Sequence, residues 1–99
     1  MTLPGLSPTL LVLASLADGS KHGYAMTLAI EDMAGVRLGP GTLYGAITRL
    51  EEEGLIQALQ ARERQQTYRI TPAGLRALRQ RLESMERFAS AGLRKLEAR

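Results

Sequence analysis

The stretch GPGTLYGAITRLEEEGLI, residues 39–56, decides how the chain folds. Its apolar residues Leu43, Ile47 and Leu50 are spaced by four and three positions, which places them on one face of a helix. A proline near the start suits a first helical turn, and the glycine after the three glutamates suits the left-handed end of a helix. The stretch therefore predicts a helix over residues 40–53.

The opposite face of this helix is bare. It carries small or polar residues and one cation, namely Gly41, Thr42, Gly45, Thr48 and Arg49. Glycine lets another molecule approach the backbone closely, and the N-terminus of a helix attracts anions. A phosphate backbone is therefore the expected neighbour. We expect Arg49 to contact phosphate and the smaller residues to approach base edges in the major groove, although a solvated face is the alternative.

The composition indicates one small domain. The chain has 99 residues, of which 44% are hydrophobic and 23% are charged, as is ordinary for a globular protein. It has no cysteine, which excludes disulfides, thiolate metal sites and cysteine nucleophiles and fits a reducing compartment. Aromatic residues make up 4%, which gives little support to a stacking surface for single-stranded nucleic acid.

Positive charge is concentrated in the second half of the chain. The net charge is +3, and cations and anions balance up to Leu50. Between Arg62 and Arg81, six arginines face only Glu63. Such a cluster is typical of a surface that binds a polyanion, although solvated basic faces are also common.

The N-terminal segment TLLVLASLA, residues 9–17, is as apolar as the core of a signal peptide. No cation precedes it, prolines interrupt the approach to it, and it is far too short to span a bilayer. We therefore expect a buried helix in a cytoplasmic protein without membrane association. The helix should start at Ser7, a capping hydroxyl followed by proline, and end near Asp18. Because it is apolar on nearly every side, we expect two surfaces to cover it.

The remaining elements predict a mainly α fold with a small β-hairpin. A second helix is expected over residues 23–33. Its buried side should carry Met26, Ile30 and Met33. LIQALQ (residues 55–60) and TYRI (residues 67–70) predict two strands joined by the basic tip ARERQQ, and Thr71 then caps a long last helix. Helix, turn and helix followed by a hairpin is a winged helix-turn-helix, here extended by a long C-terminal helix.

Four motifs resemble those of the PadR family of bacterial transcriptional regulators. They are His-Gly-Tyr at 22–24, Gly-Thr-Leu-Tyr at 41–44, Arg-Leu-Glu-x-x-Gly at 49–54 and Tyr-x-x-Thr-x-x-Gly at 68–74. The resemblance implies a DNA-binding repressor with a winged helix domain in residues 1–71. It also implies a C-terminal dimerisation helix in residues 72–99, as in the small subfamily. The wing tip RERQQT departs from relatives, which often have a run of glycine, arginine and proline there.

The bare helix face and the resemblance together predict which residues contact duplex DNA. The Tyr44 hydroxyl would bond a phosphate, or else the ring packs half-buried. His22, the one histidine, is expected to orient the turn before the second helix, and Lys21 to reach a phosphate. The predicted set is Lys21, His22, Tyr24, Gly41, Thr42, Tyr44, Gly45, Thr48, Arg49, and Arg62 and Arg64 at the wing tip.

The last helix carries an unbroken heptad repeat. A helix of about 25 residues, at about 1.5 Å per residue, extends beyond a small domain, so its later turns need another surface. We expect a twin helix, assisted by the first helix. The predicted homodimer interface is Leu10, Leu13, Leu75, Leu78, Leu82, Met85, Phe88, Ala89, Gly92 and Leu96. The resemblance implies that a planar apolar effector of unknown identity could bind between the helices, with Phe88 and Met85 lining its site in place of the usual tryptophan.

The sequence gives no support for catalysis. Glu51, Glu52 and Glu53 are consecutive, so they point in different directions on a helix and predict a solvated end. No nucleophile–base pair, phosphate loop or metal-ligand spacing occurs, and we expect neither an enzyme nor a cofactor. The leading alternative is a winged helix that docks an acidic protein partner. An RNA-binding wing domain is third, because aromatic residues are few. Salt-dependent, sequence-selective binding to duplex DNA would distinguish the main hypothesis from the leading alternative.

Overall fold

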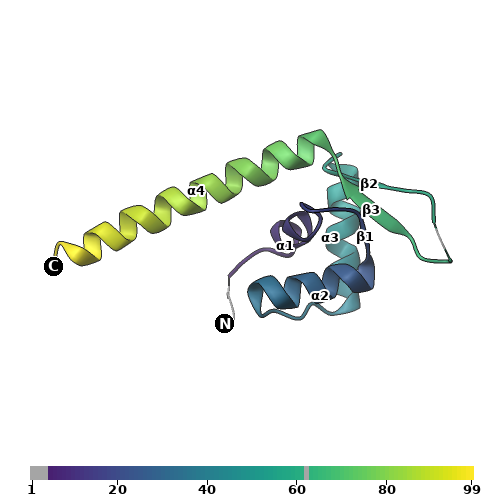
Figure 1. Ribbon diagram of the computed structural model, residues 1–99, viewed down its shortest axis with the longest axis horizontal. Coiled ribbons are helices and arrows are strands. Elements are labelled where there is room, and N and C mark those ends of the chain that lie inside the picture. Colours follow the sequence, from purple (N-terminus) through teal and green to yellow (C-terminus); the bar gives the residue numbers. More distant parts are fainter. Residues whose placement is uncertain (1–4, 62) are drawn as a thin grey trace.

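The computed structural model describes residues 5–61 and 63–99. The molecule measures 56 × 26 × 20 Å and has a globular N-terminal part from which one long helix projects (Figure 1). In chain order its elements are α1 (Pro8–Ser15), β1 (Lys21–His22), α2 (Gly23–Ala34), α3 (Pro40–Glu52), β2 (Ile56–Ala58), β3 (Thr67–Ile70) and α4 (Pro72–Glu97). This is the predicted mainly α fold with a small antiparallel sheet. None of the helices in the described residues has the length and apolar character that a membrane span requires.

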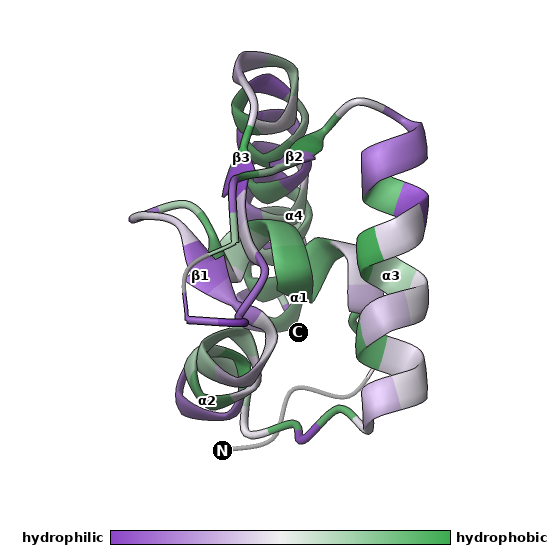
Figure 2. Cartoon of the chain, turned by 90° about the vertical axis from the view of Figure 1, so that its right-hand side faces the viewer, coloured by the Kyte–Doolittle hydropathy of each residue, from purple (hydrophilic) through white to green (hydrophobic). Residues whose placement is uncertain are grey.

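α1 lies at the centre of the globular part. Leu11 and Leu16 are buried, and Figure 2 shows α1 as a strongly apolar helix surrounded by the other elements. The Ser7 hydroxyl accepts a hydrogen bond from the Leu10 N–H at 3.2 Å, which confirms the predicted cap. The helix ends at Ser15, earlier than predicted. The N–H groups of the next two residues bond carbonyl oxygens three positions back instead of four, which tightens the chain into a turn.

The structure corrects the expectation that α1 needs a covering surface from outside its own domain. Leu10 and Leu13 are only 4% and 1% exposed within a single chain. Because α2, α3 and α4 of the same chain all pack against α1, these two leucines have no free surface for a partner subunit.

α2 and α3 pack against α1 and form the helix-turn-helix. Gly35, with a φ angle of 68°, ends α2 in a left-handed conformation. Met26 and Ile30 are buried as predicted, but Met33 is 46% exposed. Ala34, four residues after Ile30, takes the next buried position, and Met33 lies beside that stripe.

Three short strands form an antiparallel sheet in the order β1–β3–β2. Ala58 lies opposite Tyr68, which confirms the hairpin, although β2 is shorter than predicted. On the other side of β3, Lys21 of β1 also pairs with Tyr68. The sequence predicts only a turn at β1, because a strand of two residues has no periodicity to detect. Tyr68 is buried in the central strand, and burial, together with the charge of Glu51, raises its pKa.

Thr71 joins the end of α3 to the start of α4. Its hydroxyl donates to the Gly54 carbonyl oxygen at 2.7 Å and accepts from the Gly74 N–H at 3.0 Å. Its own N–H donates to the Leu55 carbonyl oxygen at 3.0 Å. A Cβ atom on Gly74 would collide with that same oxygen. The Thr-x-x-Gly pattern is therefore explained by a helix cap and a close approach of two backbone segments.

α4 belongs to the globular part only in its first two turns. Leu78 is buried, whereas every residue from 81 to 90 is exposed. The helix continues without a break for 26 residues, which confirms the predicted long C-terminal helix.

Candidate nucleic-acid interface

α3 lies at the surface with one face packed and the other open. Leu43, Ile47 and Leu50 are buried, as their spacing predicts. The open face contains all the contact residues predicted on this helix, namely Gly41, Thr42, Tyr44, Gly45, Thr48 and Arg49. Figure 2 shows α3 at the edge of the molecule, with pale and purple segments between its apolar ones.

The first turn of α3 lacks a side-chain cap. Gly39 stands at the N-cap position without a side chain to accept a hydrogen bond, and Pro40 follows it without an N–H. α2 differs, because there the Nδ1 atom of His22 accepts from the Ala25 N–H at 3.3 Å, as expected for a residue that orients this turn. Uncapped N–H groups and the positive end of the helix dipole make the start of α3 attractive to an anion.

Gly41 and Gly45 have no packing role within the described chain. A Cβ atom built on either glycine meets no atom within 4 Å. Gly45 lies in the helix interior, where glycine costs about 1 kcal/mol of stability relative to alanine. The chain thus keeps a less stable helix whose backbone another molecule can approach closely.

Tyr24 and Tyr44 line a groove between α2 and α3. The groove has a volume of about 520 Å³, and Thr27 and Arg37 also contribute to its walls. Tyr44 is half exposed, and its hydroxyl lies so close to Gly23 that a Cβ atom there would collide with it. Packing therefore fixes the position of the ring, while half of the side chain faces solvent beside the open start of α3.

Thr48 and Arg49 complete the open face. The Thr48 hydroxyl donates to the Tyr44 carbonyl oxygen at 2.9 Å, so it remains an acceptor for a base edge but has no free proton to donate. The Nε atom of Arg49 lies 3.2 Å from Oε1 of Glu53. This face therefore presents few side-chain donors to bases.

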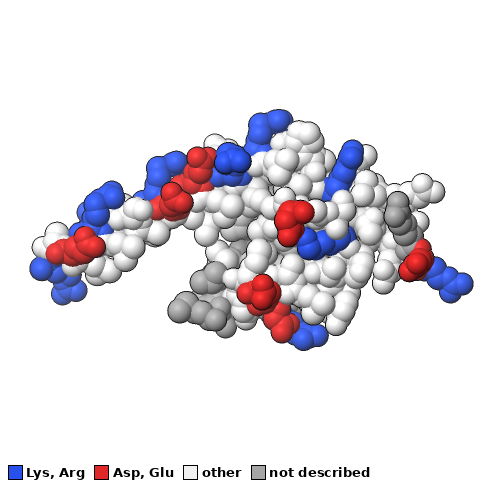
Figure 3. All heavy atoms as spheres, viewed as in Figure 1, with Lys and Arg blue, Asp and Glu red and all other residues white. Residues whose placement is uncertain are grey.

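The other two cations within residues 5–61 also form ion pairs. Lys21 Nζ lies 2.5 Å from Oδ1 of Asp18, and Arg37 lies 3.3 Å from Glu31. The hydrogen bond from Lys21, followed by its charge, lowers the pKa of Asp18. In contrast, no ion pair involves the described arginines of the hairpin and α4. Figure 3 shows basic side chains along the upper edge of α4 and at the end of the hairpin.

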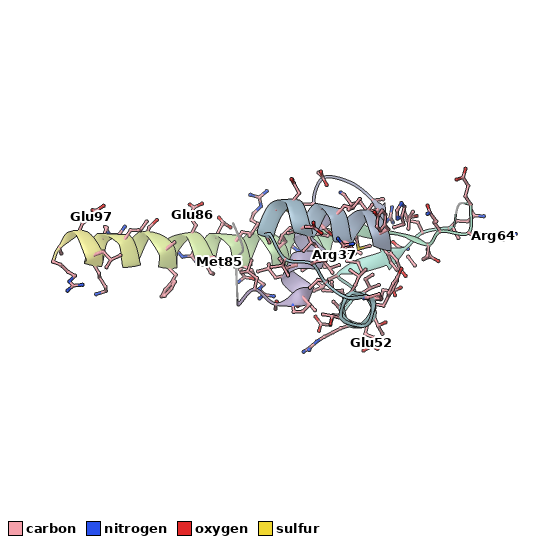
Figure 4. The ribbon with its side chains drawn as sticks, turned by 90° about the horizontal axis from the view of Figure 1, so that it is seen from below. Arg37, Glu52, Arg64, Met85, Glu86 and Glu97 are labelled. Atoms are coloured by element: carbon pink, nitrogen blue, oxygen red, sulfur yellow. The ribbon has the colours of Figure 1, made fainter. Side chains whose placement is uncertain are left out.

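The hairpin between β2 and β3 forms the wing. Glu63 and Arg64 at its tip have φ angles of 51° and 66°, a left-handed conformation that non-glycine residues rarely adopt. Figure 4 shows Arg64 at the far end of the wing, away from the helices. Arg62, predicted to act with Arg64, lies outside the described residues. Nearer the body, Arg69 donates two hydrogen bonds to Gln57, at 3.1 and 2.8 Å.

α4 leaves a wide apolar face uncovered, and Figure 4 shows Met85 on the part that has left the globular body. The exposed large residues are Leu75, Leu82, Met85, Phe88, Leu93 and Leu96. Ala89 adds a small side chain to the same face, and Gly92 leaves the backbone there uncovered by a side chain. Leu78, like the two leucines of α1, is buried in its own chain and is not available to a partner. The heptad pattern misses Leu93, which lies five turns after Leu75 and therefore on the same side.

The end of α3 carries no arrangement typical of catalysis. Glu51, Glu52 and Glu53 are all exposed there, as expected for a solvated helix end. Within residues 5–61 and 63–99, no group of three or more side chains could hold a metal ion.

Comparison with known proteins matches the region from α1 to the first turns of α4. The model of the transcriptional regulator PadR-like family matches residues 12–80. The transcriptional regulator Rv3488 of Mycobacterium tuberculosis is 37% identical over 82 residues, which cover 79% of this chain and 75% of that protein. A 37.1 kDa protein in transposon TN4556 of Streptomyces fradiae is 49% identical over 80 residues, which cover 81% of this chain. The chain spans only 23% of that relative's length.

A solved structure shares the fold over nearly its whole length. The crystal structure of a PadR family transcription regulator from Clostridium difficile R20291 has a TM-score of 0.81 to this chain. The match covers 92% of this chain and 99% of that chain at 20% identity, so it shows a common fold.

Proposed function

The chain belongs to the PadR-like family of transcriptional regulators, and from this premise we propose that it is a homodimeric repressor of a near-palindromic DNA operator. α3 would enter the major groove, and the wing would contact the neighbouring phosphate backbone. The regulatory effect would come from DNA binding alone, without enzymatic activity.

The observation that carries this proposal is the open face of α3. Gly41 and Gly45 leave the backbone of that face without side chains, although nothing in the described chain fills the space above them. The uncapped helix start beside them attracts anions. Base edges lie at the floor of the major groove, between two phosphate backbones. A helix that contacts them must therefore be narrow and must not repel phosphate. The combination fits duplex DNA better than an acidic protein surface, which needs no such close approach.

The proposed dimer would form through the exposed apolar face of α4. Leu82 and Met85 are half exposed at its centre, and a Cβ atom on Gly92 meets no atom within 4 Å. Small residues at 89 and 92 would let a second helix cross closely. Two α3 helices related by a two-fold axis would then lie about 34 Å apart, which is one turn of DNA. A planar apolar effector would bind on the same face, with Phe88 and Met85 as its walls.

The glycine face provides the sharpest test. Gly45→Ala should raise the free energy of unfolding by about 1 kcal/mol, because alanine favours the helix and its methyl group meets no atom of the described residues within 4 Å. The same change should weaken binding to a duplex selected from a random pool by about tenfold or more, because the methyl group holds α3 away from the groove floor. Chemical denaturation and fluorescence anisotropy measure the two effects.

Ser90→Ala provides the matched control, because this exposed residue of α4 lies outside the open face of α3. Alanine favours the helix there too, and duplex binding should not change. A Gly45→Ala protein that bound the selected duplex as tightly as the wild type would contradict the proposed role of α3. If the wild type bound no duplex, the alternative of a winged helix that docks an acidic protein partner would be favoured.

A further inference from the structure

Every Lys or Arg within residues 5–61 belongs to one of the three ion pairs described above. The helix-turn-helix therefore has no cation free of a carboxylate, although the proposed function brings this part closest to DNA. The described arginines of the wing and α4 have no such partner. Within the proposed DNA-binding surface, charge pairing thus distinguishes the helix-turn-helix from the wing.

Two of the pairs involve cations that the sequence predicts to contact phosphate. Arg49 extends from the open face of α3, and Glu53 follows it after one helical turn. Lys21 lies on β1, directly before the start of α2, and Asp18 lies in the turn that follows α1. In both pairs the carboxylate occupies one of the donor positions on the cation that a phosphate could use.

Both carboxylates are held by local, exposed contacts only. The side chain of Asp18 is 84% exposed and that of Glu53 is 49% exposed. Neither forms a hydrogen bond to a third described side chain. The cations differ, because the side chain of Arg49 is 73% exposed and that of Lys21 is 20% exposed. An ion pair whose carboxylate is exposed contributes little to stability, so folding alone gives a weak reason for the presence of either acid.

We propose that Asp18 and Glu53 compete with DNA phosphates for Lys21 and Arg49, and so hold duplex affinity below the level that the two cations alone would give. The inference rests on the proposed function, because it requires α3 to face DNA. Each carboxylate holds one N–H group of its cation, partly neutralises the charge of that cation and repels a phosphate that approaches the remaining N–H groups. Phosphate contacts supply the sequence-independent part of DNA affinity. The competition therefore weakens binding to every sequence and makes tight binding depend more on the fit of α3 to the groove.

The test replaces each acid with its neutral amide. Asp18→Asn and Glu53→Gln keep the side-chain size at exposed positions, and circular dichroism should show an unchanged fold. Binding of a fluorescent duplex of mixed sequence is measured by anisotropy from low to moderate KCl. At low salt each variant should bind about fivefold tighter, the equivalent of one exposed ion pair. The slope of log affinity against log salt should steepen by about 0.9, because one more phosphate is neutralised.

Asp32→Asn is the matched control. It removes an exposed carboxylate of α2 that forms no ion pair with a described residue, so it changes the net charge by the same amount without releasing a described cation. Its effect on affinity should stay below about twofold, because salt screens charges that do not touch the duplex. Combining Asp18→Asn with Lys21→Gln should abolish the gain, since no cation remains to be released.

The outcomes separate this inference from the proposed function. If Asp18→Asn and Glu53→Gln bind the duplex no tighter than the wild type, the competition is overturned and the proposed function stands. A gain of equal size in Asp32→Asn would show that only net charge matters, which also overturns the competition. If the wild type and all variants fail to bind duplex DNA even at low salt, the proposed function is overturned, and this inference with it.

Discussion

Two pairs of glycines in this molecule face opposite surroundings. A Cβ atom on Gly23 or Gly74 would collide with other atoms of the chain, whereas one on Gly41 or Gly45 would meet open space. The first pair is required by internal packing. In the second pair, Gly45 lies in the helix interior, where it lowers helix stability without any gain inside the described chain. The difference separates residues that serve the fold from residues that would serve a partner.

The same division runs along α4. Leu78 is buried in the core, whereas Leu82, one turn later, is 46% exposed. A substitution before this boundary should affect folding, and one beyond it should affect assembly. Substitutions on each side of this boundary test whether the buried part of α4 serves folding and the exposed part serves assembly.

The largest expected effect comes from charges on the exposed face of α4. Changing both Leu82 and Met85 to aspartate would place two charges in the proposed dimer seam, at a cost of several kcal/mol per ion. The two residues are half exposed in the single chain, so the variant should remain folded but become monomeric. It should also lose tight operator binding, although every residue of the open face of α3 is intact. Light scattering and circular dichroism measure assembly and fold separately.

The control for this variant places aspartates at Gln80 and Ser84, two other exposed positions of α4. It introduces the same charges outside the apolar face and should not change the oligomeric state. If the seam variant scattered light as a dimer, the proposed interface on α4 would be wrong.

A smaller effect is expected from Gly74→Ala, on the folding side of the comparison. The added methyl group would overlap the Leu55 carbonyl oxygen and the side chain of Ile70, so backbone must shift. Overpacking of this kind costs about 1–3 kcal/mol. For a domain of this size, thermal unfolding should shift down by about 4–8 °C for each kcal/mol lost. An unchanged midpoint would mean that α4 can move away from the sheet without cost, contrary to the packing described here.

The smallest effect is expected from Arg64→Ala at the wing tip. Arg64 is exposed and far from α3, so we expect it to contact phosphate and not base edges. Its loss should weaken binding to all duplexes alike and reduce the salt slope by about one unit. Competition binding with the selected duplex and a scrambled one, repeated over a range of salt concentrations, measures the loss of affinity and the change in salt slope. If Arg64→Ala weakened binding to the selected duplex only, the wing would instead contribute to sequence-specific recognition.

The order of the elements could be predicted because its signals are local. A hydroxyl followed by proline starts both α1 and α4, at Ser7 and Thr71, and both caps are present in the structure. The buried side of α3 follows from the spacing of Leu43, Ile47 and Leu50. Each of these signals acts within a few residues, so no knowledge of the tertiary fold is needed.

Features that depend on distant segments could not be predicted in this way. β1 is a strand only because β3, more than forty positions later, pairs with it. From the sequence, Leu10 and Leu13 are predicted to lie in the dimer interface, because the sequence of α1 does not show that α4 of the same chain packs against it. The pairing of Lys21 with Asp18 depends instead on a nearby feature, the shape of the turn that separates them.

For the candidate site, the sequence identified the exposed face of α3 but not the ion pairs that its cations form. The structure gathers the predicted residues of α3 on one exposed surface. Lys21 and His22 lie on β1, before the groove that Tyr24 and Tyr44 line. Whether these residues contact DNA stays a prediction. A count of charges along the sequence could not reveal that each cation of this part is already matched with an acid.

The joint at Thr71 gives the molecule a mechanical property. Its bonds to Gly54, Leu55 and Gly74 fasten the end of α3 to the first turn of α4, so the two helices should move as one body. The 26 residues of α4 make a rod about 39 Å long. In the proposed dimer, a tilt of about 10° around the far end of that rod would swing its near end by about 7 Å, roughly a fifth of the 34 Å between half-sites. α4 would thus act as a lever, and anything that alters the angle at which two copies cross would change the operator spacing that the pair can span.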